Sequence, residues 1–213
     1  YAEIGEAREG GTEGEYSAIL YARERFRADA SGTFWLSSTP ERVSNDWGNA
    51  NIRVCTWGRF ADTKTGQAFY LFNTHLDHVS QPSRDKGVRL IVRRIQARAH
   101  PDPFVLTGDL NAGEDNPAIR YLKGVETNEG VAPITLIDTF RLLHPDAAHV
   151  GTFHSFKGTT AGPKIDFILT PASTHVLEAT ILHTNRDGRY PSDHFPVTAR
   201  LGFHQADTPG RGS

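Results

Sequence analysis

The spacing of apolar residues along the chain predicts two helices. Between residues 83 and 99 they recur three and four positions apart, which places them on one side of a helix that ends before Pro101. Several arginines fall elsewhere around this helix, where a solvated face explains them better than a phosphate-binding stripe. Residues 116–124 begin with Asn-Pro, a pair typical of a capped helix start. We therefore expect one long helix and one short helix.

Short apolar runs bounded by polar or glycine-containing turns predict strands. The runs at 51–60 and 67–75 flank Asp-Thr-Lys-Thr-Gly, a polar turn typical of a hairpin. Many strands with few helices favour an α+β fold of stacked, antiparallel-rich sheets covered by helices. The predicted strands are 16–21, 51–60, 67–75, 104–107, 134–139, 151–155, 165–170, 175–183 and 195–203.

The composition is that of a soluble globular domain. The chain has 213 residues, of which 38% are hydrophobic and 23% charged, and its net charge is −2. The mild acidity argues against a strongly basic nucleic-acid-binding surface, although a metal ion can supply local positive charge. No apolar run is long enough for a membrane helix. We assign residues 1–203 to one domain, expected to be a monomer, and residues 204–213 to a flexible tail.

Cys55 is the only cysteine, so an internal disulfide and a thiolate metal cluster are excluded. It lies in an apolar run with Val54 and Trp57. A small, soft side chain in such a run is typical of a buried structural thiol, and we expect this in preference to a nucleophile.

Four polar motifs each lie at the end of an apolar, strand-like run. A strand alternates its faces, so Asp109 and Asn111 point the same way from the run at 104–107. Together the motifs supply histidines, carboxylates and one carboxamide, a set suited to metal-assisted attack on a phosphate ester. They are Asn73-Thr74-His75-Leu76-Asp77-His78, Thr107-Gly108-Asp109-Leu110-Asn111, Lys164-Ile165-Asp166-Phe167 and Ser192-Asp193-His194-Phe195.

The residue types in these motifs suggest different tasks. A phosphodiester resists hydrolysis because its anionic oxygens repel hydroxide, so catalysis needs charge neutralisation, an oriented water and a proton for the leaving oxygen. Asp109 can polarise water, and the Asn111 amide can donate to a phosphoryl oxygen. Asp166 lies in an apolar strand and needs a partner. His194 is the natural one, because a carboxylate on one ring nitrogen fixes the tautomer; the alternative is a purely structural pair.

The whole set, in this order, resembles the endonuclease/exonuclease/phosphatase superfamily, which includes pancreatic deoxyribonuclease, apurinic endonucleases, sphingomyelinases, deadenylases and nocturnin. The resemblance implies a four-layer αββα sandwich like that of deoxyribonuclease I. It also implies a phosphate-contacting, proton-donating histidine, an aspartate that orients water, an asparagine that contacts phosphate, and an Asp–His pair. These roles are matched by His75, Asp109, Asn111, and Asp166 with His194.

The same resemblance assigns further residues. Glu15 matches a glutamate that supports His75, and Arg8 matches a phosphate clamp. Asp193 matches a metal ligand or an outer support for one, and Asp109 matches a metal ligand. The metal is expected to be Mg²⁺ or Mn²⁺, which also suits oxygen donors without thiolates. From its position beside the motifs, Phe195 is expected to contact a base or sugar of the substrate, as Phe153 and Phe156 could; Asp77 and His78 are expected at the surface or in support of the site.

Complete members of the superfamily also carry an early strand ending in asparagine and a Gln-Glu pair whose glutamate is the principal magnesium ligand. Neither precedes Tyr1, so the resemblance implies that the first segment is absent from this sequence, and the cellular location stays open between cytoplasmic and secreted. We expect a Mg²⁺- or Mn²⁺-dependent hydrolase of a phosphodiester or phosphomonoester. Nucleic acid, a nucleotide, a sugar phosphate and a phospholipid headgroup are open as substrates. The alternative is a catalytically silent phosphate- or nucleic-acid-binding module.

Overall fold

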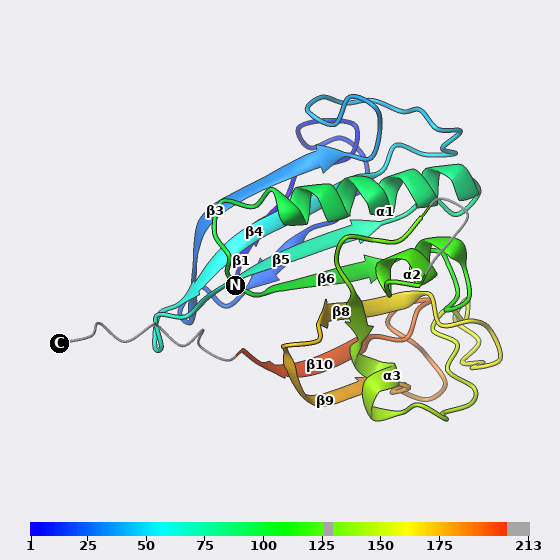
Figure 1. The fold of residues 1–213 in the computed structure, drawn as a ribbon. Helices are drawn as coiled ribbons and strands as arrows, with labels where there is room; N and C mark the ends of the chain where they lie inside the picture. Colours follow the sequence, from blue (N-terminus) through cyan, green and yellow to red (C-terminus); the bar gives the residue numbers. More distant parts are fainter. Residues whose placement is uncertain (126–129, 204–213) are drawn as a thin grey trace.

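The centre of the structure, a computed structural model that describes residues 1–125 and 130–203, is a six-stranded sheet (Figure 1). The strand order is β3-β4-β5-β6-β8-β7. Neighbours are antiparallel except β5 (Ala68–His75) and β6 (Phe104–Asp109), which run parallel and are connected through helix α1 (Gln81–Gln96). The remaining strands are β3 (Phe26–Trp35), β4 (Val54–Asp62), β7 (Leu136–Asp138) and β8 (Asp166–Pro171).

Two small antiparallel sheets accompany the central one. They are β1–β2 (Ala2–Ile4 with Ile19–Tyr21) and β9–β10 (His175–Ile181 with Val197–Gly202). Strands β1 and β2 contact β4, and β10 contacts β8. A groove of about 560 Å³ borders β10 and the central strands. The described residues thus form a mixed α/β domain, and they do not by themselves complete the second sheet of the predicted four-layer sandwich.

Helices α1 and α2 pack on one face of the central sheet (Figure 1). The start of α2 is the one that the sequence predicts, whereas α1 runs from Gln81 to Gln96 in place of the predicted 83–99. The Ser80 side chain accepts a hydrogen bond from the Ser83 amide at the start of α1. Asn116 does the same for α2 (Pro117–Leu122), with proline in the first turn. Their buried faces join the main core, whose fully buried members include Phe72, Ile91, Ile95, Leu106, Ile119, Leu122 and Phe167. Cys55 is completely buried in this core, as expected.

The structure differs from the predicted elements in four places, one of which is the additional strand β1 (Ala2–Ile4). The expected strand at 151–155 is reduced to one isolated bridge between Phe153 and His194. Strand β3, also absent from the prediction, pairs only with β4 at the edge of the central sheet. Only Phe34 and Trp35 of its ten residues are buried, so its sequence lacks a sustained apolar alternation. Helix α3 (Thr139–Leu143) is also additional, and the Asp138 carboxylate accepts its first amides. The predicted tail at 204–213 lies outside the described residues.

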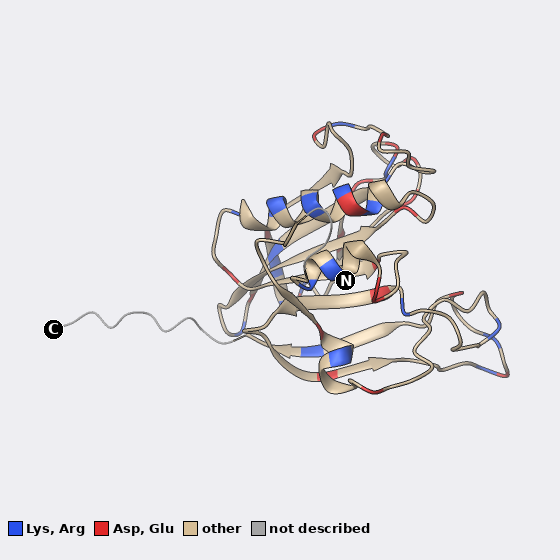
Figure 2. Ribbon diagram, turned by 45° about the vertical axis from the view of Figure 1, so that its right-hand side comes forward, with Lys and Arg blue, Asp and Glu red and all other residues tan. Residues whose placement is uncertain are grey.

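Basic side chains follow helix α1 (Figure 2), but they are not all solvated. Arg84 is buried and donates to the carbonyl oxygen of Asp77 and to Gln81. Arg89 lies over the ring of Tyr121. The expectation of a uniformly solvated arginine face is therefore wrong for these two residues. Among the described residues, no helix is long and apolar enough to cross a membrane.

Candidate active site

The parallel pairing of β5 and β6 places His75 directly beside Asp109. The two residues end their strands in register, and His75 Nε2 lies 3.3 Å from Asp109 Oδ2. The strands approach closely here because Gly108, with φ +149°, has no side chain. A Cβ at this position would lie 1.8 Å from the carbonyl oxygen of Thr74. Glycine at this point of the Thr-Gly-Asp motif is therefore required by the backbone.

Strand β8 supplies the next carboxylate from the other side of β6. Asp166 pairs with Asp109 in the antiparallel register. Its Oδ2 atom lies 2.8 Å from Nδ1 of His194, so the expected contact between these two residues is present. His194 turns its other ring nitrogen, Nε2, toward Asp109 Oδ2 at 3.9 Å. The carboxylate on Nδ1 therefore holds the ring with Nε2 facing the strand ends.

His75 is held in the same manner from the N-terminal part of the chain. Its Nδ1 atom lies 2.5 Å from Glu15 Oε1, as the sequence predicts. Arg8 donates from Nη1 to the other oxygen of Glu15 at 2.8 Å. The Arg8 side chain is thus anchored beside the histidine, and its role as a phosphate clamp stays a prediction.

Arg53 also belongs to this region, although sequence reasoning did not identify it. It is 4% exposed and lines a small space together with Arg8, Glu15 and His75. Its Nη2 atom lies 3.2 Å from His78 Nδ1, and its Nε atom lies 3.7 Å from Asp77 Oδ1. The one signal in the sequence is a charged residue at the start of an apolar strand, which is costly to bury without partners.

Asp77 and Asn111 organise the loops around the strand ends. The Asp77 carboxylate is buried and accepts hydrogen bonds from the amides of Ala50, Asn51, Val79 and Ser80, which agrees with a supporting role. Asn111, at φ +45°, donates from Nδ2 to the carbonyl oxygen of Leu76. An amide NH₂ has two hydrogens, so Asn111 retains one for another acceptor. Its backbone amide donates to Asp109 Oδ1 at 2.8 Å.

The charges of the site shift its pKa values in complementary directions. Burial acts to raise the pKa of Asp109, but hydrogen bonds from His75 and the Asn111 amide lower it overall. For His75, burial acts to lower the pKa, and its bonds with Asp109 and Glu15 raise it overall. The hydrogen bond to Asp166 raises the pKa of His194 despite partial burial. Ionised carboxylates therefore face imidazoles that hold their protons more readily than free histidine.

One group of described residues can hold a metal ion. Ligand atoms of Asp109, Asp166 and His194 lie within 4.8 Å of one another. The two carboxylates are the members of this group that suit Mg²⁺ or Mn²⁺, because these hard cations prefer oxygen ligands. Asp193 is outside this group, and its Oδ1 accepts a hydrogen bond from Ser192. The assignment of Asp193 as a metal ligand therefore stays a prediction.

The expectation that Phe195 contacts substrate is wrong. Phe195 is 2% exposed and stacks on His154 with ring centroids 3.9 Å apart. Phe153, which forms the isolated bridge with His194, is 47% exposed, and its ring centroid lies 5.0 Å from that of His194. Phe156 is also exposed. An aromatic surface next to the site thus exists, but Phe153 provides it.

Comparison with known proteins agrees with this geometry. Residues 9–194 match the sequence model described as "Endonuclease/Exonuclease/phosphatase family". A protein of that family from Bacteroides thetaiotaomicron is 31% identical, with a TM-score of 0.83 over 96% of this chain and 76% of that chain. The mannosyl-6-phosphatase Bt3783 of the same organism is 32% identical, with a TM-score of 0.81 over 95% and 77%. D. rerio TDP2 complexed with single-strand DNA product is 18% identical, with a TM-score of 0.69 over 95% and 77%, and shows the fold alone.

Proposed function

This chain belongs to the endonuclease/exonuclease/phosphatase family of phosphoesterases, which are typically metal-dependent, and from that premise we propose that it hydrolyses phosphate esters with Mg²⁺ or Mn²⁺. One observation carries the proposal. Two histidines, His75 and His194, each have Nδ1 held by a carboxylate and Nε2 directed toward Asp109 Oδ2. A module that only binds phosphate has no need of two such pairs.

The geometry supports the following proposed roles. Asp109 orients the water that attacks phosphorus in line with the leaving oxygen. His75 and His194 donate through Nε2 to the oxygens on which negative charge grows, and Glu15 and Asp166 keep the rings in place. The free N–H of the Asn111 amide and the guanidinium of Arg8 are additional donors for phosphoryl oxygens.

A bound divalent cation would neutralise phosphoryl charge. Asp109 and Asp166 are the carboxylates that would hold it, because they are the two in the group with His194. Asp193 directly precedes His194 in the sequence. Its negative charge contributes to the raised pKa of the His194 imidazole, so it is a further carboxylate near this group. We propose it as an additional or outer support for the cation.

A sugar phosphate monoester is the substrate class that we propose first. The supporting observation is the 32% identity to a mannosyl-6-phosphatase over 95% of this chain. The exposed ring of Phe153 beside His194 suits the apolar face of a sugar. A net charge of −2 gives no general attraction for a nucleic-acid backbone. We expect the loops around the site to select the size and the linkage of the substrate.

The test is an assay of three esters: mannose 6-phosphate, bis(p-nitrophenyl) phosphate and single-stranded DNA. Each is incubated with Mg²⁺, with Mn²⁺ and with a chelator. We expect metal-dependent turnover, fastest on the monoester, that is lost in Asp109→Asn and kept in Asp115→Asn, a change of an exposed aspartate. Faster cleavage of DNA than of mannose 6-phosphate would identify nucleic acid, and not a sugar phosphate, as the substrate class. Binding of the esters without turnover of any would favour the silent module.

A further inference from the structure

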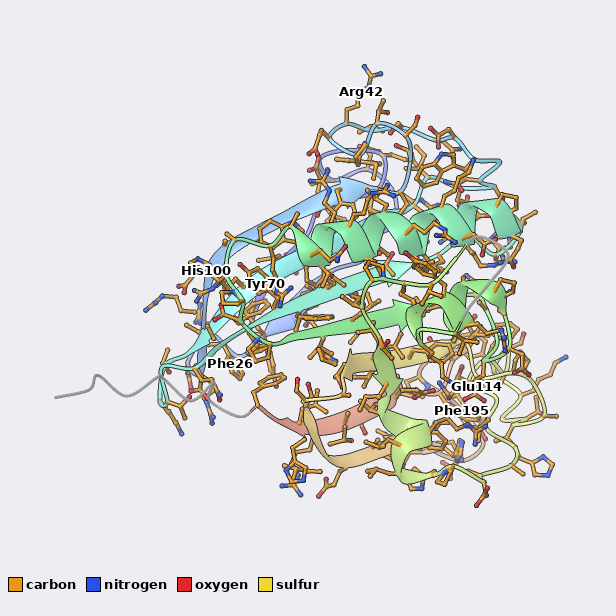
Figure 3. All side chains as sticks on the ribbon, viewed as in Figure 1. Phe26, Arg42, Tyr70, His100, Glu114 and Phe195 are labelled. Carbon is orange, nitrogen blue, oxygen red and sulfur yellow. The ribbon has the colours of Figure 1, made fainter. Side chains whose placement is uncertain are left out.

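A second cavity lies at the opposite end of the central sheet from the site just described. Its volume is about 290 Å³, and residues of β3, β4, β5 and the segment after α1 line it. Figure 3 shows Tyr70 and His100 at this end of the sheet and Phe195 at the other. Strand β5 connects the two regions, since Tyr70 lies near its start and His75 at its end. A molecule in this cavity would not occupy the phosphate site.

Aromatic rings form the inner wall of the cavity. Trp57, Tyr70 and Phe72 all line it, and successive rings in this order have centroids 6.2 Å apart. Among the contacts of the described residues, neither the Trp57 indole N–H nor the Tyr70 hydroxyl has a hydrogen-bond partner. Buried or half-buried Trp and Tyr usually satisfy these groups. Tyr70 and Phe72 are each 2% exposed, so the half-buried Trp57 indole is the ring of this wall that a ligand can reach, and its free N–H can orient the ligand.

The cavity is open because several side chains around it are small and because helix α1 ends at Gln96. Residues of the segment that follows α1, among them Ala97 and Ala99, border the space in place of a further helical turn. Ala30, Ala97 and Ala99 border the space and are all exposed. Gly32 allows the Trp57 indole to lie against β3, since a Cβ there would be 3.0 Å from Nε1. Larger side chains at these positions would fill the space.

The rim of the cavity carries positive charge. Arg94 and Arg98 line it, and Arg94 is paired with the Glu41 carboxylate. Arg98 instead donates to two backbone carbonyls, and the nearby Asp102 carboxylate pairs with Arg59. Within the described part of the chain, Arg98 thus has no carboxylate partner. Its charge is available to an anion at the mouth of the cavity.

We propose that this cavity is a binding site for a small planar aromatic anion. The ring would pack on Trp57, and the anionic group would lie toward Arg98. Ring stacking supplies the apolar contact, the free indole N–H supplies orientation, and the guanidinium supplies selectivity for negative charge. This cavity is separate from the phosphate site, so the proposal of ligand binding here does not depend on the proposed hydrolase activity.

The test uses naphthalene-2-sulfonate and its uncharged analogue naphthalene-2-methanol, with affinities measured by isothermal titration calorimetry. Ala97→Leu fills the cavity from an exposed position, and Ala172→Leu, another exposed alanine, is the matched control. We expect the sulfonate to bind the wild type, with affinity about tenfold lower in Ala97→Leu and unchanged in Ala172→Leu. Arg98→Met should lower the affinity for the sulfonate about fivefold and leave the affinity for the alcohol unchanged.

Three outcomes would overturn the proposal. The first is no binding of the sulfonate to the wild type at about 2 mM, a concentration that detects even weak sites. The second is equal affinity in the wild type and Ala97→Leu. The third is binding that is lost in His194→Ala but kept in Ala97→Leu, because it would assign the ligand to the phosphate site.

Discussion

Asp166 and His194 lie 28 residues apart in the sequence, and their side chains meet with 2.8 Å between Oδ2 and Nδ1. The same relationship recurs between Glu15 and His75, which are separated by 60 residues. Both imidazoles direct Nε2 toward Asp109 Oδ2. Two carboxylate–histidine pairs from distant parts of the chain thus converge on one central carboxylate, and the predictions that follow test this convergence and the fold that supports it.

Replacing Asp166 with asparagine should lower turnover about a hundredfold, the usual scale for loss of an oriented acid-base group. Asparagine keeps the shape, but it removes the charge that raises the pKa of His194 and holds its tautomer. The measurement is kcat on the best substrate, with folding checked by circular dichroism. Asp187→Asn changes an exposed aspartate and should have no effect. Near-normal turnover of folded Asp166→Asn would show that the pair is structural.

Binding of Mn²⁺ should depend on Asp109, because its carboxylate is central to the group that can hold a cation. We expect Mn²⁺ to raise the melting temperature of the wild type by mass action. In Asp109→Ala the same concentration should give a much smaller rise, and a titration should show affinity at least about tenfold lower. Equal Mn²⁺ stabilisation of both proteins would place the cation elsewhere.

Phe153→Ala should reduce kcat/KM on substrates that contain a sugar or base ring by about tenfold, since stacking on one ring contributes about 1–3 kcal/mol. The reason is the exposed ring of Phe153 beside His194. Glycerol phosphate, which has no ring, should be hydrolysed at nearly the wild-type rate. An equal loss on both kinds of substrate would mean that Phe153 supports His194 and does not contact substrate.

The decrease in the free energy of unfolding at acidic pH should depend partly on Asp62. Hydrogen bonds from Arg25, with further ones from the amides of Lys64 and Thr65, hold the pKa of Asp62 well below its usual range. A carboxylate with a lowered folded pKa stabilises the fold above its unfolded pKa of about 3.9 and loses this effect as pH falls toward the folded value.

Asp62→Asn should therefore lower the urea midpoint at pH 7, and its difference from the wild type should shrink as the pH is lowered below about 3. Asp115→Asn, at an exposed position, is the control. A difference between wild type and Asp62→Asn that is constant with pH would show that the charge of Asp62 does not contribute.

The parts of this molecule that could be predicted from sequence are those with a local cause. The period of apolar residues in α1, the Asn-Pro start of α2 and the hairpin turn at Asp62 are set by near neighbours. The motifs at strand ends could be recognised because their residue types and order are distinctive. The role of Glu15 beside His75 needed the family resemblance, since 60 residues separate the two.

What failed depended on tertiary surroundings. His194 and Phe195 are adjacent, and an extended chain turns successive side chains to opposite sides, so the histidine faces the site and the phenylalanine is buried. Edge strand β3 was missed because only Phe34 and Trp35 of its ten residues are buried, so its sequence has no sustained apolar alternation. Arg53 was missed because its carboxylate and histidine partners come from other segments.

Lys164, the first residue of the Lys-Ile-Asp-Phe motif, should be essential for stability. It is 1% exposed, and its Nζ lies 2.8 Å from Asp138 Oδ2 and over the ring of Phe167, although the ion pair is not aligned as a hydrogen bond. Burial lowers the pKa of Lys164, which reflects the cost of the charge, and the charge of Asp138 opposes this effect. Asp138 also caps α3.

Lys164→Met keeps the volume and leaves the buried Asp138 carboxylate without its cation. Removing one partner of a buried pair typically costs about 3–5 kcal/mol, more than the pair itself contributes, because the remaining charge is uncompensated. We expect a loss of this size in the free energy of unfolding, measured by urea denaturation at pH 7. Lys157→Met, at an exposed lysine, should change it by less than about 0.5 kcal/mol. If Lys164→Met were as stable as Lys157→Met, Asp138 would have to be neutral or otherwise satisfied in the folded protein.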